Sequence, residues 1–146
     1  MIQHIDVHAV LQRSVSSVYT DLVTRPTGRA VREEIERALA AAGGVRIAVM
    51  DFSRVGCVDY SCADEVVAKL LRDGLLVLML RGTTDGHREA LEPVLKGHGL
   101  AVVLEQPDGT LDGLGTAEAA EALLDDLVAQ RLAARMPGGT IALTAA

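Results

Sequence analysis

Two kinds of hydrophobic pattern alternate along the chain. Residues 45–50 and 75–80 are apolar nearly throughout, which predicts strands that are covered on both faces of a sheet. Residues 101–104 show the same pattern more weakly. Between the first two strands, apolar positions recur every three or four residues and predict a helix that ends at Gly74. The apolar positions of this helix are Ala63, Val66, Val67, Leu70 and Leu71.

Three further segments have helical periodicity. The first begins with Pro-Thr-Gly at residues 26–28 and ends at a pair of glycines. The second begins with Thr84 or Asp85 as its N-cap and ends near residues 97–99, and the third begins after Thr116. The apolar stripe of the first of these helices consists of Val31, Ile35, Ala38, Leu39 and Ala42.

The two ends of the chain carry weaker patterns. Residues 2–12 alternate loosely between apolar and polar, which predicts a first strand with one wetter face. Pro-Asp-Gly at residues 107–109 predicts a tight turn after the third buried strand. Residues 137–146 begin with Pro-Gly-Gly and then become apolar, so this tail is either a docked edge strand or disordered.

Strands that alternate with helices require parallel strands joined by right-handed crossovers. The sequence therefore predicts an α/β fold, in which a sheet of parallel strands is flanked by about four helices. No repeat or linker divides the chain, so we expect one domain at residues 1–136 and a C-terminal tail at residues 137–146. Ile35, Val49, Val67 and Leu78 are expected in the core.

Composition and charge narrow the classes of partner. The formal net charge is -6 and only 2% of the residues are aromatic, so neither a basic surface nor stacking platforms favour nucleic acid. The apolar runs are far shorter than the roughly 20 residues that a membrane span needs. We expect no nucleic-acid partner, no membrane insertion and a cytoplasmic location.

Functional residues of such sheets lie at the carboxyl ends of the strands, so the segment after residue 50 is the candidate functional site. Ser61 is predicted to cap the following helix, with Asp64 and Glu65 in its first turn. The alternative is that Ser61 is a phosphate acceptor at the helix N-terminus. The two cysteines, Cys57 and Cys62, are predicted to be buried, reduced thiols.

Three motifs that are typical of nucleotide-binding proteins and hydrolases do not occur in the sequence. It contains no G-x-x-x-x-G-K, G-x-G-x-x-G or G-x-S-x-G, so we expect no nucleotide cofactor and no serine hydrolase chemistry. His4 and His8 would share one strand face too far apart for one metal, and His87 and His98 would lie at helix ends, on the surface or in a second layer. No metal site is expected.

Three alternatives stay open, one of which is a purely structural subunit of a larger assembly. A thiol-dependent or redox-responsive enzyme would use Cys62, with its pKa lowered at a helix N-terminus and Cys57 as resolving partner. An anion site would use Arg25, Arg29 and Arg32, although the i,i+4 pairs Arg29/Glu33 and Arg32/Glu36 favour a solvated helix face.

After the first buried strand, Asp-Phe-Ser at residues 51–53 is followed by Asp-Tyr-Ser at residues 59–61 and then by an apolar helix. This order resembles the STAS domain of anti-sigma factor antagonists. Residues 61–65, Ser-Cys-Ala-Asp-Glu, are closer to a STAS-like variant in which a serine, an apolar residue and Ala-Asp-Glu open that helix. The resemblance extends to residues 98–100, His-Gly-Leu, and covers residues 45–104 best.

This resemblance implies a mixed, mostly parallel β-sheet packed with helices. It also implies a regulatory domain without catalytic activity that binds an anti-sigma factor or a serine kinase of the histidine-kinase-like ATPase type. A homodimer is left open. The family carries its phosphorylated serine directly after the aspartate, where this chain has Tyr60, so Ser61 and Tyr60 are the candidate switch residues. The contact surface implied by the resemblance consists of Asp59, Tyr60, Ser61, Cys62, Asp64 and Glu65.

Overall fold

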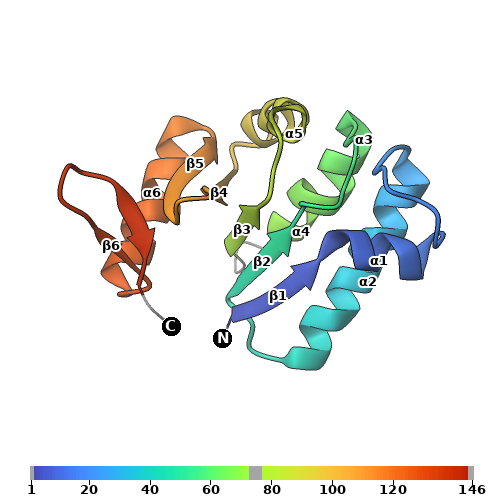
Figure 1. Ribbon diagram of the computed structural model, residues 1–146, viewed down its shortest axis with the longest axis horizontal. Helices are drawn as coiled ribbons and strands as arrows, with labels where there is room; N and C mark the ends of the chain where they lie inside the picture. Colours follow the sequence, from blue (N-terminus) through green and yellow to red (C-terminus); the bar gives the residue numbers. More distant parts are fainter. Residues whose placement is uncertain (1, 73–76, 145–146) are drawn as a thin grey trace.

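The computed structural model describes residues 2–72 and 77–144. They form a seven-stranded sheet in the order β1-β2-β3-β4-β5-β7-β6 (Figure 1). The first four strands are parallel and the remaining pairings are antiparallel. This is the mixed α/β sheet that the sequence predicts. The first four strands are β1 (Ile2–Asp6), β2 (Ile47–Asp51), β3 (Val77–Arg81) and β4 (Ala101–Glu105).

The three continuously apolar segments form the central strands, as predicted. Ile47–Met50 of β2 are fully buried, and so are Leu78–Leu80 of β3 and Ala101–Leu104 of β4. Helices cover one face of these strands, and α6 (Ala117–Ala129) packs on the other face at β4. Gly74, the predicted end of the second helix, and Leu75, the predicted start of its strand, lie outside the described residues.

Two hydrophobic clusters fill the two faces of the sheet. Ala48 and Leu78 point toward the larger cluster, which includes Ile35 and Val67 from the helices. Val49 and its neighbours on the opposite face belong to a smaller cluster with α6 (Ala117–Ala129). Ile35, Val49, Val67 and Leu78 are all buried, which confirms the predicted core.

The helices of the larger cluster match the predicted periodicity. They are α2 (Arg25–Ala42) and α5 (Asp85–Gly97), together with a helix built from α3 (Tyr60–Cys62), the π-helical segment η1 (Ala63–Ala68) and α4 (Lys69–Leu71). Thr84 caps α5 and Thr116 caps α6, and each hydroxyl accepts a backbone N–H three residues on. Pro26 occupies the first turn of α2, where its missing N–H costs nothing.

The prediction of a strand at residues 2–12 was wrong in part. Only Ile2–Asp6 forms a strand, and Val7–Ser14 forms the helix α1. The side chain of Asp6 accepts a hydrogen bond from the Ala9 backbone at 3.2 Å and starts the helix there. Val7, Val10 and Leu11 then form one buried stripe of the helix. The predicted alternation fits Val7 and Leu11 but places Val10 on the wetter face. His8 consequently lies on a helix, and not on a strand face with His4.

The C-terminal part adds three strands to the sheet. A turn at residues 106–109 connects β4 to β5 (Thr110–Gly115), as the Pro-Asp-Gly motif predicts, although β5 itself was not expected. β6 (Ala133–Arg135) and β7 (Ile141–Leu143) pair with one another, and β7 also pairs with β5. Ile141–Leu143 therefore lies inside the sheet, with β6 at the edge.

Candidate functional site

The N-cap of the helix after β2 lies two residues before the position that the sequence predicts. Asp59 is the N-cap, and its Oδ1 accepts the backbone N–H of Cys62 at 2.8 Å. Ser61 lies inside the first turn, and its hydroxyl donates to the same Asp59 oxygen at 2.8 Å. The prediction that Ser61 caps the helix with Asp64 was therefore wrong. An aspartate two residues earlier already satisfies the orphan backbone donor.

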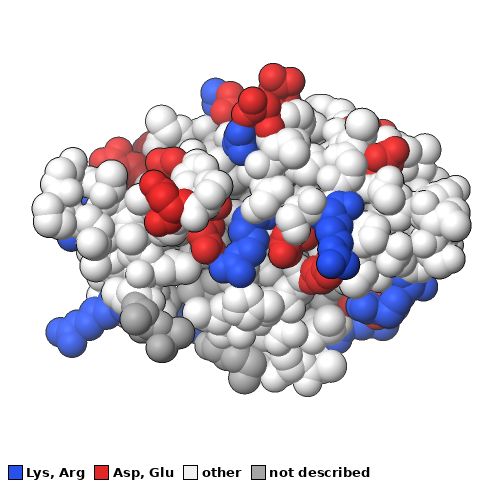
Figure 2. Space-filling model, viewed as in Figure 1, with Lys and Arg blue, Asp and Glu red and all other residues white. Residues whose placement is uncertain are grey.

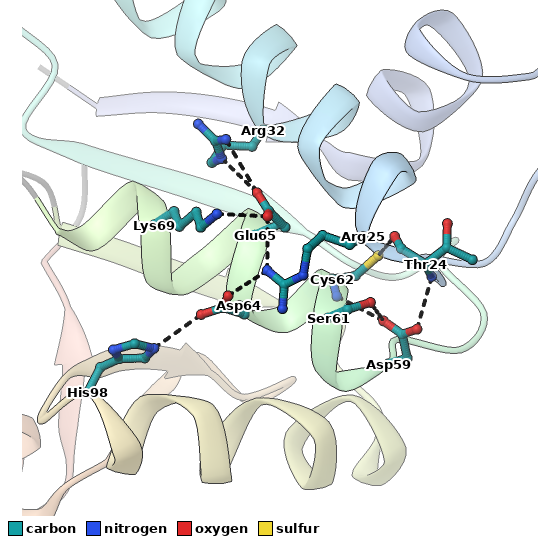
Figure 3. Close-up of polar contacts among 10 residues, drawn as sticks. All are labelled: Thr24, Arg25, Arg32, Asp59, Ser61, Cys62, Asp64, Glu65, Lys69 and His98. Carbon is teal, nitrogen blue, oxygen red and sulfur yellow. Dashed lines mark hydrogen bonds and ion pairs between the residues drawn. The ribbon is translucent and has the colours of Figure 1, made fainter.

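Asp59 also ties this helix to the loop that precedes α2 (Figure 3). Its Oδ2 accepts the backbone N–H of Thr24 at 2.9 Å, and Leu22 forms a β-bridge with Val58 beside it. Partial burial acts to raise the pKa of Asp59, but the hydrogen bonds from Cys62, Thr24 and Ser61 outweigh it and lower this pKa overall. The carboxylate is thus fixed in its ionised form by three donors.

Cys62 is buried at the contact between this helix and α2. Its Sγ donates to the Thr24 carbonyl oxygen at 3.1 Å. Burial raises the pKa of the Cys62 thiol to about 12, and the negative charge of Asp59 acts in the same direction. This is the opposite of the lowered pKa that a thiolate nucleophile needs. Cys57 is exposed, so the expectation that both thiols are buried was wrong for this residue.

Glu65 is a fully buried carboxylate surrounded by three cations (Figure 3). Lys69 and Arg25 donate to its Oε1 at 2.8 and 2.9 Å, and Arg32 approaches its Oε2 at 3.3 Å. Burial alone would raise the pKa of Glu65, but the hydrogen bonds from Lys69 and Arg25 dominate and lower it to about 2. Glu65 remains ionised because its charge is compensated from α2 and from its own helix.

Arg25 connects the buried carboxylate to a second one nearer the surface. Its Nη1 also donates to Asp64 Oδ2 at 2.7 Å, and Asp64 Oδ1 lies 3.1 Å from His98 Nε2 at the end of α5. Two of the three arginines of the predicted alternative anion site, Arg25 and Arg32, therefore neutralise an acidic residue of the protein itself. Arg32 also pairs with Glu36 one turn away, as its spacing predicts.

The geometry around Glu65 depends on a π-helical stretch. Ala63–Ala68 has π-helical hydrogen bonding, and the Lys69 backbone N–H reaches back five residues to the Asp64 carbonyl. A π turn accommodates one more residue than an α turn, and such insertions are frequent at functional sites. The apolar periodicity of the sequence predicts a helix here but contains no signal for the wider turn.

Tyr60 is the exposed member of the predicted contact surface. It is the first helical residue after the Asp59 cap, and 61% of it is accessible to solvent. Asp59, Ser61 and Asp64 are half-buried, whereas Cys62 and Glu65 are buried. The six predicted contact residues thus share one helix, but only Tyr60 presents most of its side chain to a partner.

A second exposed apolar group lies on the loop joined to Asp59, and the sequence patterns did not reveal it. Val18, Tyr19 and Val23 are exposed there and line a shallow hollow of about 270 Å³ together with Thr24. The only signal in the sequence was compositional, because Tyr19 and Tyr60 are two of the three aromatic residues in the chain.

His87 is buried, in contrast to the expectation of a surface or second-layer histidine. Its Nδ1 accepts the Thr84 backbone N–H at 3.1 Å, and its Nε2 lies 2.6 Å from the Gly56 carbonyl oxygen. This arrangement assigns the proton to Nε2. His87 thereby fixes the loop between β2 and α3 onto the start of α5.

The remaining features of the molecule concern metal ligands, membrane spans and the distribution of charge. In the part of the chain that the structure describes, no group of three or more His, Cys, Asp or Glu side chains could hold a metal ion, and no helix is long and apolar enough to cross a bilayer. Acidic and basic side chains are interspersed on the face shown in Figure 2. No family model matches the chain, and no curated protein or solved structure matches it significantly.

Proposed function

We propose that this protein is a non-enzymatic regulatory domain that binds a protein partner through the start of the helix after β2. The proposed contact surface is Asp59–Glu65 with Tyr60 at its centre, extended by the exposed loop residues Val18, Tyr19 and Val23. The observation that carries this proposal is that Tyr60, a residue type enriched in binding hot spots, is mostly exposed on a helix start that is otherwise rigidly held.

The state of the neighbouring polar groups supports binding over catalysis. A general base needs a carboxylate or imidazole that can reach substrate. Asp59 already accepts three hydrogen bonds, and Glu65 is buried among three cations. These groups position the surface and stabilise it, but they offer no reactive atom to a ligand.

The thiol enzyme is the less well-supported function. Its nucleophile would be Cys62, which is inaccessible and has a raised pKa. Its resolving partner would be Cys57, which is exposed. A buried neutral thiol that donates to a carbonyl is the arrangement of a structural cysteine.

The resemblance to STAS-like domains suggests the class of partner, an anti-sigma factor or a histidine-kinase-like ATPase that phosphorylates serine, and a cytoplasmic setting. Ser61 and Tyr60 differ as switch residues. The Ser61 hydroxyl donates to Asp59, so a phosphate there would replace a hydrogen bond by repulsion between two anions. Tyr60 is accessible, but a serine kinase would not modify it.

The experiment is a binding assay with an ATPase or sigma regulator encoded beside this protein, measured by isothermal titration calorimetry. We expect a one-to-one complex that Ser61→Asp weakens while circular dichroism and the melting temperature show an intact fold. If Ser61→Asp binds as tightly as the wild type, the phosphorylation switch is wrong. If no complex forms with any such partner, the proposed partner class is wrong.

A further inference from the structure

The α1–α2 segment, residues 15–24, carries the exposed apolar half of the proposed partner surface. Val18, Tyr19 and Val23 are exposed in it. Apart from one β-bridge at Leu22, the segment contains no helix or strand. A surface that is ordered before a partner arrives avoids the entropic cost of ordering it on association. The order of this segment therefore depends on its contacts with other parts of the chain.

Thr24 shows that the α1–α2 segment does not hold its shape alone. Its φ of 71° lies in the left-handed region, which a β-branched residue rarely adopts. Such strain persists only where the surrounding structure imposes it. Two contacts impose it here. The Thr24 N–H donates to Asp59 Oδ2 at 2.9 Å, and the Thr24 carbonyl accepts from Cys62 Sγ at 3.1 Å.

The rest of the α1–α2 segment is paired with residues 56–59. The Leu22 N–H donates to the Cys57 carbonyl at 2.8 Å, and the Leu22 carbonyl accepts the Asp59 N–H at 2.9 Å. The Thr20 carbonyl accepts the Gly56 N–H at 2.7 Å. Residues 56–59 belong to an irregular connection between β2 and α3, so the position of this connection decides the position of the α1–α2 segment.

His87 holds the connection from α5. Its Nε2 donates to the Gly56 carbonyl at 2.6 Å and lies 3.2 Å from the Val55 carbonyl oxygen. The peptide group of the Gly56 carbonyl also contains the Cys57 N–H, which donates to Asp21 Oδ1 at 2.8 Å. A single peptide group therefore connects the His87 ring to a side chain of the α1–α2 segment.

Helix capping explains only one of the two ring nitrogens of His87. Nδ1 accepts the Thr84 N–H at 3.1 Å, and a glutamate or glutamine at this helix position supplies the same acceptor in an ordinary capping box. The Nε2 donor is additional to the cap. The ring is buried and packs against Phe52, with 5.5 Å between the ring centroids, so the direction of this donor is fixed.

We propose that His87 positions the α1–α2 segment of the partner surface through the Gly56–Cys57 peptide group. The purpose of this positioning rests on the proposed function, because the segment matters only if a partner binds it. The positioning itself is measurable in the free protein, so the two proposals can fail separately.

Two variants separate positioning from capping. His87→Asn keeps an acceptor near the place of Nδ1 but is too short to reach the Gly56 carbonyl, whereas His87→Gln is long enough to place an amide N–H near Nε2. The readout is backbone hydrogen exchange, measured by NMR at the amides of Leu22, Gly56 and Cys57. We expect exchange about tenfold faster in His87→Asn, the effect of losing one hydrogen bond. His87→Gln should restore rates close to those of the wild type.

A matched control distinguishes local positioning from a general loss of stability. Leu123→Ala removes a partly buried side chain of α6 on the other face of the sheet, and it should not accelerate exchange at Leu22 and Gly56 more than at Val49 of β2. Wild-type rates in His87→Asn, an equal acceleration at Val49 in that variant, or equal rates in His87→Asn and His87→Gln would overturn the proposal.

The partner assay tests the purpose of the positioning. Where the wild type forms a complex, His87→Asn should weaken it about tenfold and His87→Gln should bind like the wild type. Unchanged affinity in His87→Asn would contradict a role of His87 in partner binding. If the wild type forms no complex, the proposed function fails, and the exchange rates alone decide whether His87 positions the segment.

Discussion

Arg25 and Glu65 are 40 residues apart in the sequence, yet Arg25 Nη1 donates to the buried Glu65 Oε1 at 2.9 Å. The contact joins the first turn of α2 to the π-helical segment η1. Because Arg25 follows Thr24, which binds Asp59, the same junction positions both the buried charge and the start of the helix that carries Tyr60. The rigidity of the proposed partner surface depends on this junction.

Replacing the buried carboxylate should therefore destabilise the whole fold. Glu65→Gln keeps the side-chain shape but leaves Arg25, Arg32 and Lys69 without their shared anion, and we expect a loss of about 1–3 kcal/mol in the free energy of unfolding. Urea denaturation measures it. Glu36→Gln removes an exposed partner of Arg32 and is the control, with an expected loss below about 1 kcal/mol. Equal losses in the two variants would contradict the importance of the buried cluster.

The same cluster predicts a dependence of stability on pH. The pKa of Glu65 is about 2 in the folded protein, below its ordinary value of 4.5. The stabilisation from ionised Glu65 should thus be fully present above pH 4.5 and be lost as the pH falls toward 2. A shift of this size corresponds to a contribution on the order of 3 kcal/mol. The stability difference between wild type and Glu65→Gln should shrink from pH 5 to pH 3. A difference that is constant over this range would contradict the assigned pairing.

Asp59 should be more important than Ser61 for helix stability. Asp59→Ala removes the acceptor of the Cys62 and Thr24 backbone N–H groups, and we expect a loss of about 2 kcal/mol. Ser61→Ala removes a hydroxyl that only donates to Asp59, and the expected loss is about 0.5 kcal/mol. Thermal or chemical denaturation of the two variants compares them directly. A larger loss of stability in Ser61→Ala than in Asp59→Ala would indicate that Ser61 is the cap.

Gly28 and Gly97 should respond oppositely to alanine. A Cβ on Gly28 would lie 3.0 Å from Glu65 Cβ and 3.1 Å from Cys62 Sγ, so Gly28→Ala should cost about 1–3 kcal/mol by overpacking. A Cβ on Gly97 would meet nothing within 4 Å, and Gly97→Ala should stabilise the protein by up to about 1 kcal/mol. If Gly28→Ala is as stable as Gly97→Ala, the close packing of α2 on α3 is wrong.

The two thiols should differ in reactivity. Cys57 is exposed, whereas Cys62 is buried with a pKa of about 12. In the native protein at pH 8, iodoacetamide should modify Cys57 and leave Cys62 unmodified until denaturant is added. Peptide mass spectrometry locates the adduct. Rapid modification of native Cys62 would favour the thiol enzyme over the regulatory domain.

The sequence was informative where one local pattern dominated. The strands β2, β3 and β4 were predicted because an uninterrupted apolar run of this length is typical of a buried strand. The caps Thr84 and Thr116 were predicted because each hydroxyl precedes a clear apolar stripe. β5 was missed because Gly113 and Gly115 interrupt any strand pattern in it. These glycines are required there, since a Cβ on Gly113 would come within 2.4 Å of Ala120 Cβ in α6.

The structure confirms that residues 59–65 follow a buried strand and begin a helix, but the arrangement of their side chains was not predicted. The roles within this segment depend on partners from distant parts of the chain. Thr24 reaches Asp59, and Arg25 and Arg32 reach Glu65. No spacing rule within one helix could reveal that the arginines of α2 neutralise this residue and are not an anion site.

The most direct test of the proposed partner surface compares the affinities of Tyr60→Ala and Met136→Ala for a partner. The partner is a histidine-kinase-like ATPase or anti-sigma factor encoded beside this protein, and calorimetry measures the affinity. Both residues are large, apolar and exposed, but Met136 follows β6 at the far edge of the sheet. We expect Tyr60→Ala to weaken binding about tenfold or more, as truncation of a central hot spot does, and Met136→Ala to bind like the wild type. Unchanged affinity in Tyr60→Ala, with loss in Met136→Ala, would contradict binding through the helix after β2.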